Sequence, residues 1–160
     1  MTTTTDNSKL AEISLKLKGT PYCAMSTLSG TGDINARFML FANTASFDWF
    51  YLMTGKSTAK VGDLRRRPEI ALAAMTLAAD IQDYRETLIK GRATILETFS
   101  DKAVQNALEL LAEKMPMVQG LLDSGSLGDY VIIAVKTLEL KYRLYSEILE
   151  QKPPTVITFG

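Results

Sequence analysis

The sequence contains no histidine, and this absence excludes several kinds of chemistry. It has 18 basic and 18 acidic side chains among 160 residues, yet His is missing altogether. Ser-His-Asp and Cys-His catalysis, proton transfer by imidazole and most zinc sites depend on that residue. Carboxylates such as Asp80 and Asp83 are dispersed, and we interpret them as solvated turn residues rather than metal ligands. If the protein is an enzyme, we expect a cofactor to carry the chemistry.

Cysteine and long apolar runs are also scarce. A single cysteine, Cys23, excludes an internal disulfide, and the first residues, MTTTTDNSK, lack the apolar core of a secretory signal. The longest nearly apolar run, residues 70–79, is about half as long as a membrane-spanning helix. We expect a cytoplasmic protein without a membrane segment, in which residues 1–8 form a flexible tail.

Neither sign of charge is in excess. Basic and acidic residues number 18 each, so no overall field attracts nucleic acid or an acidic membrane. The basic triplet at residues 65–67 falls at the predicted end of a helix, where the helix dipole favours cations, and we interpret it as solvated. Any anion site must therefore be local.

Hydrophobic alternation predicts short strands at hairpin spacing in one domain. Strands are expected at residues 22–28, 34–40, 47–54, 69–76, 84–97 and 131–145, the last as one strand or two. Helices are expected at residues 9–18, 58–66 and 101–114, with a further helical turn at 116–122. Gly91 interrupts one strand, which indicates a bulge or a close approach to its backbone. The pattern favours an antiparallel barrel, because closure removes unpaired edges.

One strand, residues 34–40, carries a basic side chain among apolar ones. Period-two alternation places Ile34 and Phe38 on its more apolar face, and Arg37 on the opposite face.

A polar segment, residues 54–60, lies where a strand is predicted to end and a helix to begin. Its sequence is TGKSTAK, and unpaired N–H groups in the first turn of a helix suit an anion, phosphate above all. The GKS within it is similar to the end of a nucleotide-binding P-loop, but Phe50 stands where that motif requires glycine. STAK also matches the S-x-x-K nucleophile motif, whose companion motifs are missing. On pattern alone, a phosphate site and an N-capped turn with exposed lysines remain equally open.

Several motifs occur together in one order over residues 22–96. They are Arg37-Phe38-Met39 in a strand, a strand ending in Thr54, Thr58-Ala59-Lys60 opening a helix, Arg67-Pro68 ending it, and Lys90-Gly91-Arg92-Ala93 in a later strand. Taken together they resemble the pyridoxamine 5′-phosphate oxidase-like family of FMN-binding split β-barrels. The resemblance implies a mostly β (α+β) fold, an antiparallel split β-barrel of roughly six or seven strands with a few flanking helices. Residues 1–160 would form a single FMN-binding domain.

The resemblance also implies a set of cofactor-binding residues. Arg37 and Lys60 would contact the FMN phosphate and ribityl chain, Thr54 and Thr58 would add hydroxyl groups, and the backbone at Phe38 and Met39 would face the isoalloxazine ring. Many members have arginine at position 59, where this chain has alanine, so Lys56, with Ser57 beside it, is a further candidate. Authentic vitamin B6 oxidases carry a lysine at position 42, here alanine, and a C-terminal motif with histidine. We therefore expect a substrate other than pyridoxamine phosphate.

By this resemblance the protein is a homodimer with FMN at the interface. It would be an oxidoreductase that transfers hydride or electrons through flavin N5, to or from a small molecule or NAD(P)H. Trp49, Tyr51 and Tyr84 are candidates for the substrate-side wall, although such aromatic residues also serve in cores. The alternatives are a non-enzymatic flavin- or haem-binding or stress protein of the same fold, and a deazaflavin in place of FMN.

Overall fold

The structure is a computed structural model that describes residues 7–160, in which eight strands form one antiparallel sheet. The strands are β1 (Tyr22–Leu28), β2 (Ile34–Leu40), β3 (Ala42–Asn43), β4 (Trp49–Gly55), β5 (Glu69–Thr76), β6 (Arg85–Leu96), β7 (Tyr130–Leu144) and β8 (Thr155–Thr158). The helices are α1 (Asn7–Lys18), α2 (Ala59–Arg66), the 3-10 helix η1 (Ile81–Asp83), α3 (Lys102–Lys114), α4 (Pro116–Ser124) and α5 (Tyr145–Leu149). The predicted mostly β fold with flanking helices is confirmed, with short strands that the sequence did not predict.

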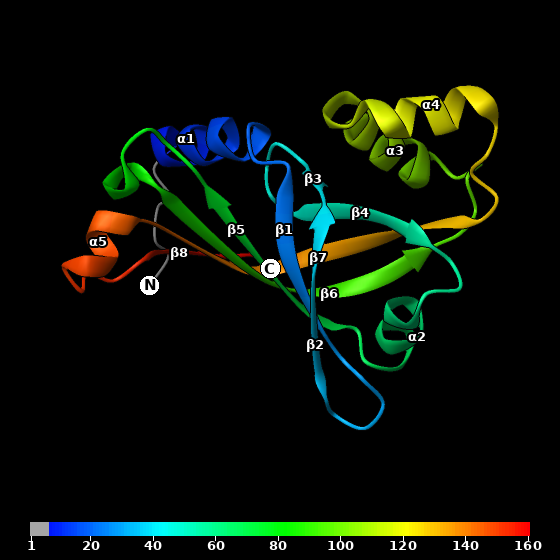
Figure 1. Ribbon diagram of the computed structural model, residues 1–160, viewed down its shortest axis with the longest axis horizontal. Helices are drawn as coiled ribbons and strands as arrows, with labels where there is room; N and C mark the ends of the chain where they lie inside the picture. Colours follow the sequence, from blue (N-terminus) through cyan, green and yellow to red (C-terminus); the bar gives the residue numbers. More distant parts are fainter. Residues whose placement is uncertain (1–6) are drawn as a thin grey trace.

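The sheet curls, and its strand order is β2-β1-β5-β6-β7-β4-β3 (Figure 1). The long strand β7 pairs with β6 along one edge, from Leu144 to Ile132. Its other edge is divided, because β4 pairs with residues 130–136 and β8 pairs with residues 139–142. The change of partner falls near Thr137, which makes β7 the strand on which the two parts of the sheet meet.

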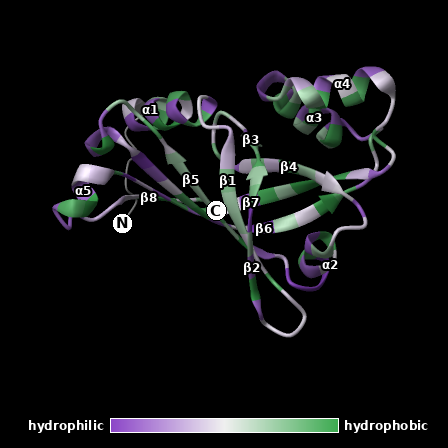
Figure 2. Cartoon of the chain, in the orientation of Figure 1, coloured by the Kyte–Doolittle hydropathy of each residue, from purple (hydrophilic) through white to green (hydrophobic). Residues whose placement is uncertain are grey.

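Two hydrophobic clusters lie on this framework. The larger cluster fills the curl, where Ile13 and Leu17 of α1 pack against residues such as Tyr142. In the smaller cluster, Leu108 and Leu111 of α3 pack against the β4 and β7 region, and Figure 1 shows α3 and α4 together at that end of the sheet. Figure 2 shows hydrophobic residues concentrated along β7, which contributes to both clusters.

Gly91 lies at a bulge where β6 touches its neighbour. The pairing of β6 with β7 shifts register between Lys90 and Gly91. A Cβ atom on Gly91 would lie 2.6 Å from the carbonyl oxygen of Lys136 and 2.6 Å from Cγ1 of Val135. Gly91 therefore lies both at a bulge and at a close approach to its backbone, the two alternatives that the sequence predicted. The approaching backbone is that of β7 in the same chain.

A tight turn before β4 holds an aromatic residue in an unusual conformation. Phe47 has a positive φ of 63° and its side chain is fully buried. Its N–H donates to the carbonyl of Thr44 at 3.1 Å, and its own carbonyl accepts from the buried Thr137 hydroxyl at 2.5 Å. The backbone N–H of Thr137 donates to Asp48 at 2.9 Å, so β7 fixes this turn through two adjacent carbonyls.

The structure adds to the interpretation of β2 and bounds two other predictions. The more apolar face of β2 is left exposed: Ile34 is 74% exposed and Phe38 is 81% exposed. The flexible tail predicted for residues 1–8 lies largely outside the described residues, and residues 7 and 8 belong to α1. No helix in the described part of the chain is long and apolar enough to cross a membrane.

Candidate functional site

Two basic side chains from separate elements lie near the start of α2, close enough for the charge of one to act on the other. Lys60 lies in the first turn of that helix, and its Nζ donates to the hydroxyl of Thr54, at the end of β4, at 3.0 Å. Arg37 lies on β2, and its Nη1 donates to the hydroxyl of Thr27 at 2.7 Å and to the carbonyl of Asn35 at 3.1 Å. A strand end, a helix start and a sheet edge thus bring together the two cations that the resemblance selected.

These cations have no acidic partner. Burial lowers the pKa of Lys60 from its usual value of 10.5, and the positive charge of Arg37 lowers it further. Among residues 7–160, no carboxylate lies within ion-pair distance of either side chain. Two neighbouring positive charges without a counter-ion favour an anion between them, since an opposite charge nearby stabilises the charged form.

The guanidinium of Arg37 keeps donors available for such an anion. Within the described residues, both of its hydrogen bonds to the protein are donated by Nη1, so Nε and Nη2 have no protein acceptor. Arginine can donate two parallel hydrogen bonds to a phosphate or carboxylate, whereas Lys60 acts as a point charge. The arrangement can therefore hold an oxyanion from two directions.

The two predicted threonines have different roles. Thr54 is buried, with 7% of its surface exposed, and its hydroxyl faces Lys60. Thr58 is the N-cap residue of α2, but its hydroxyl donates back to the carbonyl of Gly55 at 2.9 Å and caps no N–H of the helix. The first turn of α2 therefore receives no hydrogen bond from its N-cap side chain, and its N–H groups remain suited to an anion.

Lys56 and Ser57 are not brought into this pair. The ammonium group of Lys56 donates to the carbonyl of Gly128 at 2.9 Å and pairs with the carboxylate of Asp129 at 3.6 Å. It therefore ties the turn before α2 to the segment that precedes β7. Ser57 is exposed beside it.

Phe38 and Met39 occupy the end strand of the sheet. β2 is the last strand on its side and pairs there with β1, so the backbone groups on its outer edge stay open. Met39 packs against the larger cluster, whereas the Phe38 side chain stands out on the opposite face. The open edge is compatible with a ligand or partner lying along the backbone of these two residues.

Two of the three aromatic candidates for a substrate wall pack in the smaller hydrophobic cluster. Trp49 and Tyr51 stack with ring centroids 6.5 Å apart and an interplanar angle of 4°, and both belong to the smaller hydrophobic cluster. The backbone of Tyr84 closes η1 and accepts from the N–H of Tyr145. The alternative given for these residues, packing in a core, fits Trp49 and Tyr51.

Sequence reasoning missed Thr27 and Asn35, which hold Arg37 in place. The β1–β2 pairing sets Thr27 opposite Asn35, two residues from Arg37 on the same face. Asn35 also reaches Asp63 of α2, with 3.5 Å between Nδ2 and Oδ2. Pairing of the two strands predicted at residues 22–28 and 34–40 indicates this arrangement, because side chains directly opposite each other across a strand pair share a face.

No protein-family model and no curated protein sequence matches this chain. Solved structures do match it. A heme binding protein from Mycobacterium smegmatis has a TM-score of 0.73 at 14% identity, covering 93% of this chain and 57% of that one. HutZ, the heme storage protein from Vibrio cholerae, has a TM-score of 0.67 at 12% identity, with 84% and 92% covered. General Stress Protein 26 from Bacillus anthracis has a TM-score of 0.60 at 16% identity, with 94% and 98% covered.

These similarities define the fold. The chain has the split-barrel fold of these haem-binding, haem-storage and stress proteins, which is the fold that the sequence resemblance implied. It spans 57% of the length of the mycobacterial protein. At identities of 12–16% the similarity concerns the fold alone.

Proposed function

We propose that this protein binds a planar cofactor through its acidic group, with Arg37 and Lys60 as the counter-charges. The observation that carries the proposal is the meeting of these two side chains without a carboxylate partner in the described chain. Thr54 orients Lys60, while Thr27 and the carbonyl of Asn35 orient Arg37, so the site is held ready before a ligand arrives. The open edge of β2 lies next to Arg37 and gives the planar part of the cofactor a place along the backbone.

FMN is our first candidate. Its phosphate carries a charge near −2 and several acceptor oxygens, so it can accept from Arg37 and Lys60 together and from the first turn of α2. The sequence has no histidine, which is a common axial ligand of haem iron. Bound FMN would supply hydride or electron transfer, in which case the protein is an oxidoreductase whose substrate is a small molecule or NAD(P)H.

A non-enzymatic haem-binding protein is the second candidate. Two of the similar structures are named as a heme binding protein and a heme storage protein, and these names favour haem over a flavin enzyme. The propionates of haem could use the same two cations. An axial ligand would then have to come from a side chain other than histidine.

We also propose a homodimer in which the partner covers the outer face of β2. Ile34 and Phe38 are exposed there to 74% and 81%, and they adjoin Arg37 along the strand. Exposed apolar patches mark interaction sites. A second chain on this face would exclude water from the cofactor. Sedimentation analysis should find a dimer for the wild type and a monomer for Phe38→Glu, and a monomeric wild type would refute this part of the proposal.

The visible spectrum of the purified protein, followed by separate titration with FMN, a deazaflavin and haemin, identifies the cofactor. For FMN, Arg37→Ala and Lys60→Ala should each weaken binding by about 1.5–3 kcal/mol, the range for hydrogen bonds to charged groups. Arg65→Ala is the matched control, since Arg65 is an exposed arginine at the other end of α2 that pairs with Glu97. Unchanged affinity in both site variants would refute the site.

Anaerobic NADPH or NADH then tests for catalysis. Bleaching of bound flavin supports the oxidoreductase. Tight haemin binding without flavin uptake selects the second candidate.

A further inference from the structure

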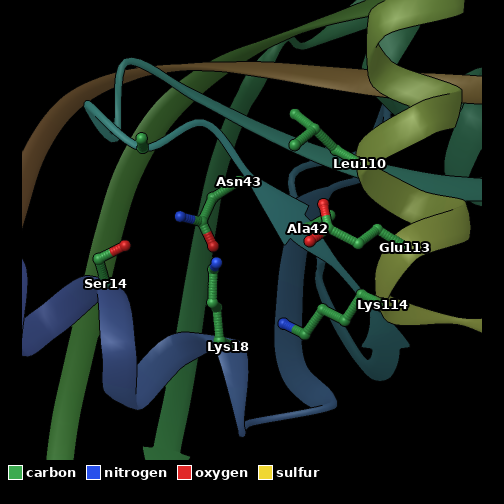
Figure 3. Close-up of a pocket in the computed structure, with 8 residues that line it drawn as sticks. Ser14, Lys18, Ala42, Asn43, Leu110, Glu113 and Lys114 are labelled. Atoms are coloured by element: carbon green, nitrogen blue, oxygen red, sulfur yellow. The ribbon is translucent and has the colours of Figure 1, made fainter.

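A separate cavity of about 330 Å³ lies between α1, β3 and α3. Its lining shares no residue with the Arg37–Lys60 site. Figure 3 shows Lys18 reaching from α1 toward the side-chain amide of Asn43 on β3, while Glu113 and Lys114 project from α3 on the other side. Pockets of a few hundred Å³ with a small number of convergent polar groups are typical of small-molecule sites.

Lys114 is the most constrained polar residue of this cavity. Its ammonium group donates to the carbonyl of Leu17, at the end of α1, at 3.0 Å and stands 3.6 Å from the ring centroid of Phe41. Within residues 7–160 no carboxylate pairs with it, and the neighbouring Glu113 makes no ion pair with it. A carbonyl and an aromatic face are weak substitutes for a negative charge.

The electrostatics agree with this geometry. Burial lowers the pKa of Lys114 to about 8, while the adjacent Cys23 acts in the opposite direction. A half-buried cation without a counter-ion is costly, and an anion in the cavity would offset that cost by favouring the charged form.

The rest of the lining limits which anion fits. Lys18 and Lys114 contribute two positive charges and Glu113 one negative charge, so a monoanion suits the cavity better than a dianion. Leu110 and Ala42 provide an apolar part of the wall. We propose that this cavity binds a short aliphatic monocarboxylate, whose carboxylate accepts from Lys114 and Lys18 and whose alkyl chain contacts Leu110 and Ala42.

Titration of the full chain with butanoate, followed by NMR or calorimetry, tests the proposal directly. Butanamide has a similar shape without the charge and should bind at least about tenfold more weakly. Sulfate, which is a dianion at neutral pH, should also bind more weakly. If butanoate binds no better than butanamide, or if sulfate binds more tightly than butanoate, the proposal is wrong.

Variants then test whether Lys114 supplies the positive charge that binds the carboxylate. Lys114→Met should lower butanoate affinity at least about tenfold, whereas Lys102→Met, at an exposed lysine of the same helix that does not line the cavity, should leave it unchanged. Equal affinities in the two variants would contradict the assignment. Circular dichroism confirms that both variants are folded.

A pH titration of the wild type gives a test that needs no variant. Butanoate affinity should fall as pH rises above about 8, where free Lys114 loses its proton. Lys18 and Glu113 also face the cavity, and Cys23 faces Lys114 from β1. Burial raises the pKa of the Cys23 thiol to about 12, so it stays neutral over this range. Lys18→Met should bind butanoate less tightly and keep the same pH dependence, and loss of that dependence would shift the assignment away from Lys114.

Discussion

Replacing Gly91 by alanine should destabilise the protein, because β7 occupies the space that a side chain needs. The new Cβ would lie 2.6 Å from the Lys136 carbonyl oxygen and from Cγ1 of Val135, whereas real Cβ contacts essentially never fall below 3.0 Å. Lys136 also pairs with Trp49 of β4, so moving its backbone disturbs both neighbours of β7. Overpacking costs about 1–3 kcal/mol, and the reduced freedom of the unfolded alanine chain offsets about 0.4–1 kcal/mol. We expect a net loss of about 1 kcal/mol.

Urea unfolding measures this loss. With an m-value of about 1–3 kcal/mol per molar, the midpoint of Gly91→Ala should fall by roughly 0.5 M without a change in slope. Gly120→Ala is the matched control, since Gly120 lies inside α4 and a Cβ there meets no atom within 4 Å. Alanine in a helix interior should raise stability by about 0.5–1 kcal/mol. If Gly91→Ala is as stable as the wild type, the proposed contact between β6 and β7 is wrong.

Two further substitutions test contacts that join distant segments. Thr137→Val keeps the side-chain shape but leaves the Phe47 carbonyl without its donor, so the free energy of unfolding should fall by about 1–3 kcal/mol. Thr94→Val, at an exposed threonine, should change the free energy of unfolding little. Equal effects of the two substitutions would contradict the reasoning. Burial would raise the pKa of Glu12, but hydrogen bonds from Tyr142 and other donors lower it below 4.5. The stability that the ionised Glu12 carboxylate contributes is therefore present above pH 4.5, and it is lost as pH falls through the lower pKa that this group has in the folded protein. Urea unfolding from pH 6 downward measures the difference in stability between wild type and Glu12→Gln. This difference should shrink in that pH window, and a constant difference would show that the ionised carboxylate does not stabilise the fold.

The longer elements could be predicted because their burial repeats over many residues. Along α3, Val104, Ala107, Leu108 and Leu111 follow the helical period, and all four are buried. β3 has two residues and β8 has four, which is too short for a period to show. Their pairing is decided by β4 and β7, which lie elsewhere in the sequence. Short strands therefore depend on neighbours that no local pattern reveals.

The faces of β2 show a second limit. Alternation tells which side chains share a face, but it does not tell which face meets the rest of the protein. Arg37 lies on the inner face because Thr27 and Asn35 hold it there, while Ile34 and Phe38 are left outside. An apolar outer face is unfavourable for an isolated chain, and no local pattern in residues 34–40 indicates which of the two faces is covered.

The candidate site could be predicted only in part from the motif order. Arg37 and Lys60 were selected from positions in two separate elements, and the structure brings them close enough for one charge to lower the pKa of the other. Their cofactor stays a prediction. Lys56 had the same chemistry and a similar place in the sequence, but its ammonium is turned to Gly128 and Asp129, more than 70 residues away along the chain. The direction of a long side chain is fixed by such distant partners.

The divided edge of β7 has a consequence for synthesis on the ribosome. β4 and β6 are complete once residue 96 has been made, yet each leaves one edge waiting for β7, which begins at residue 130. During that interval the nascent chain presents two open strand edges with apolar side chains, the kind of surface that pairs with other chains. Until residues 130–144 have been made, these two edges are therefore open to pairing with other chains.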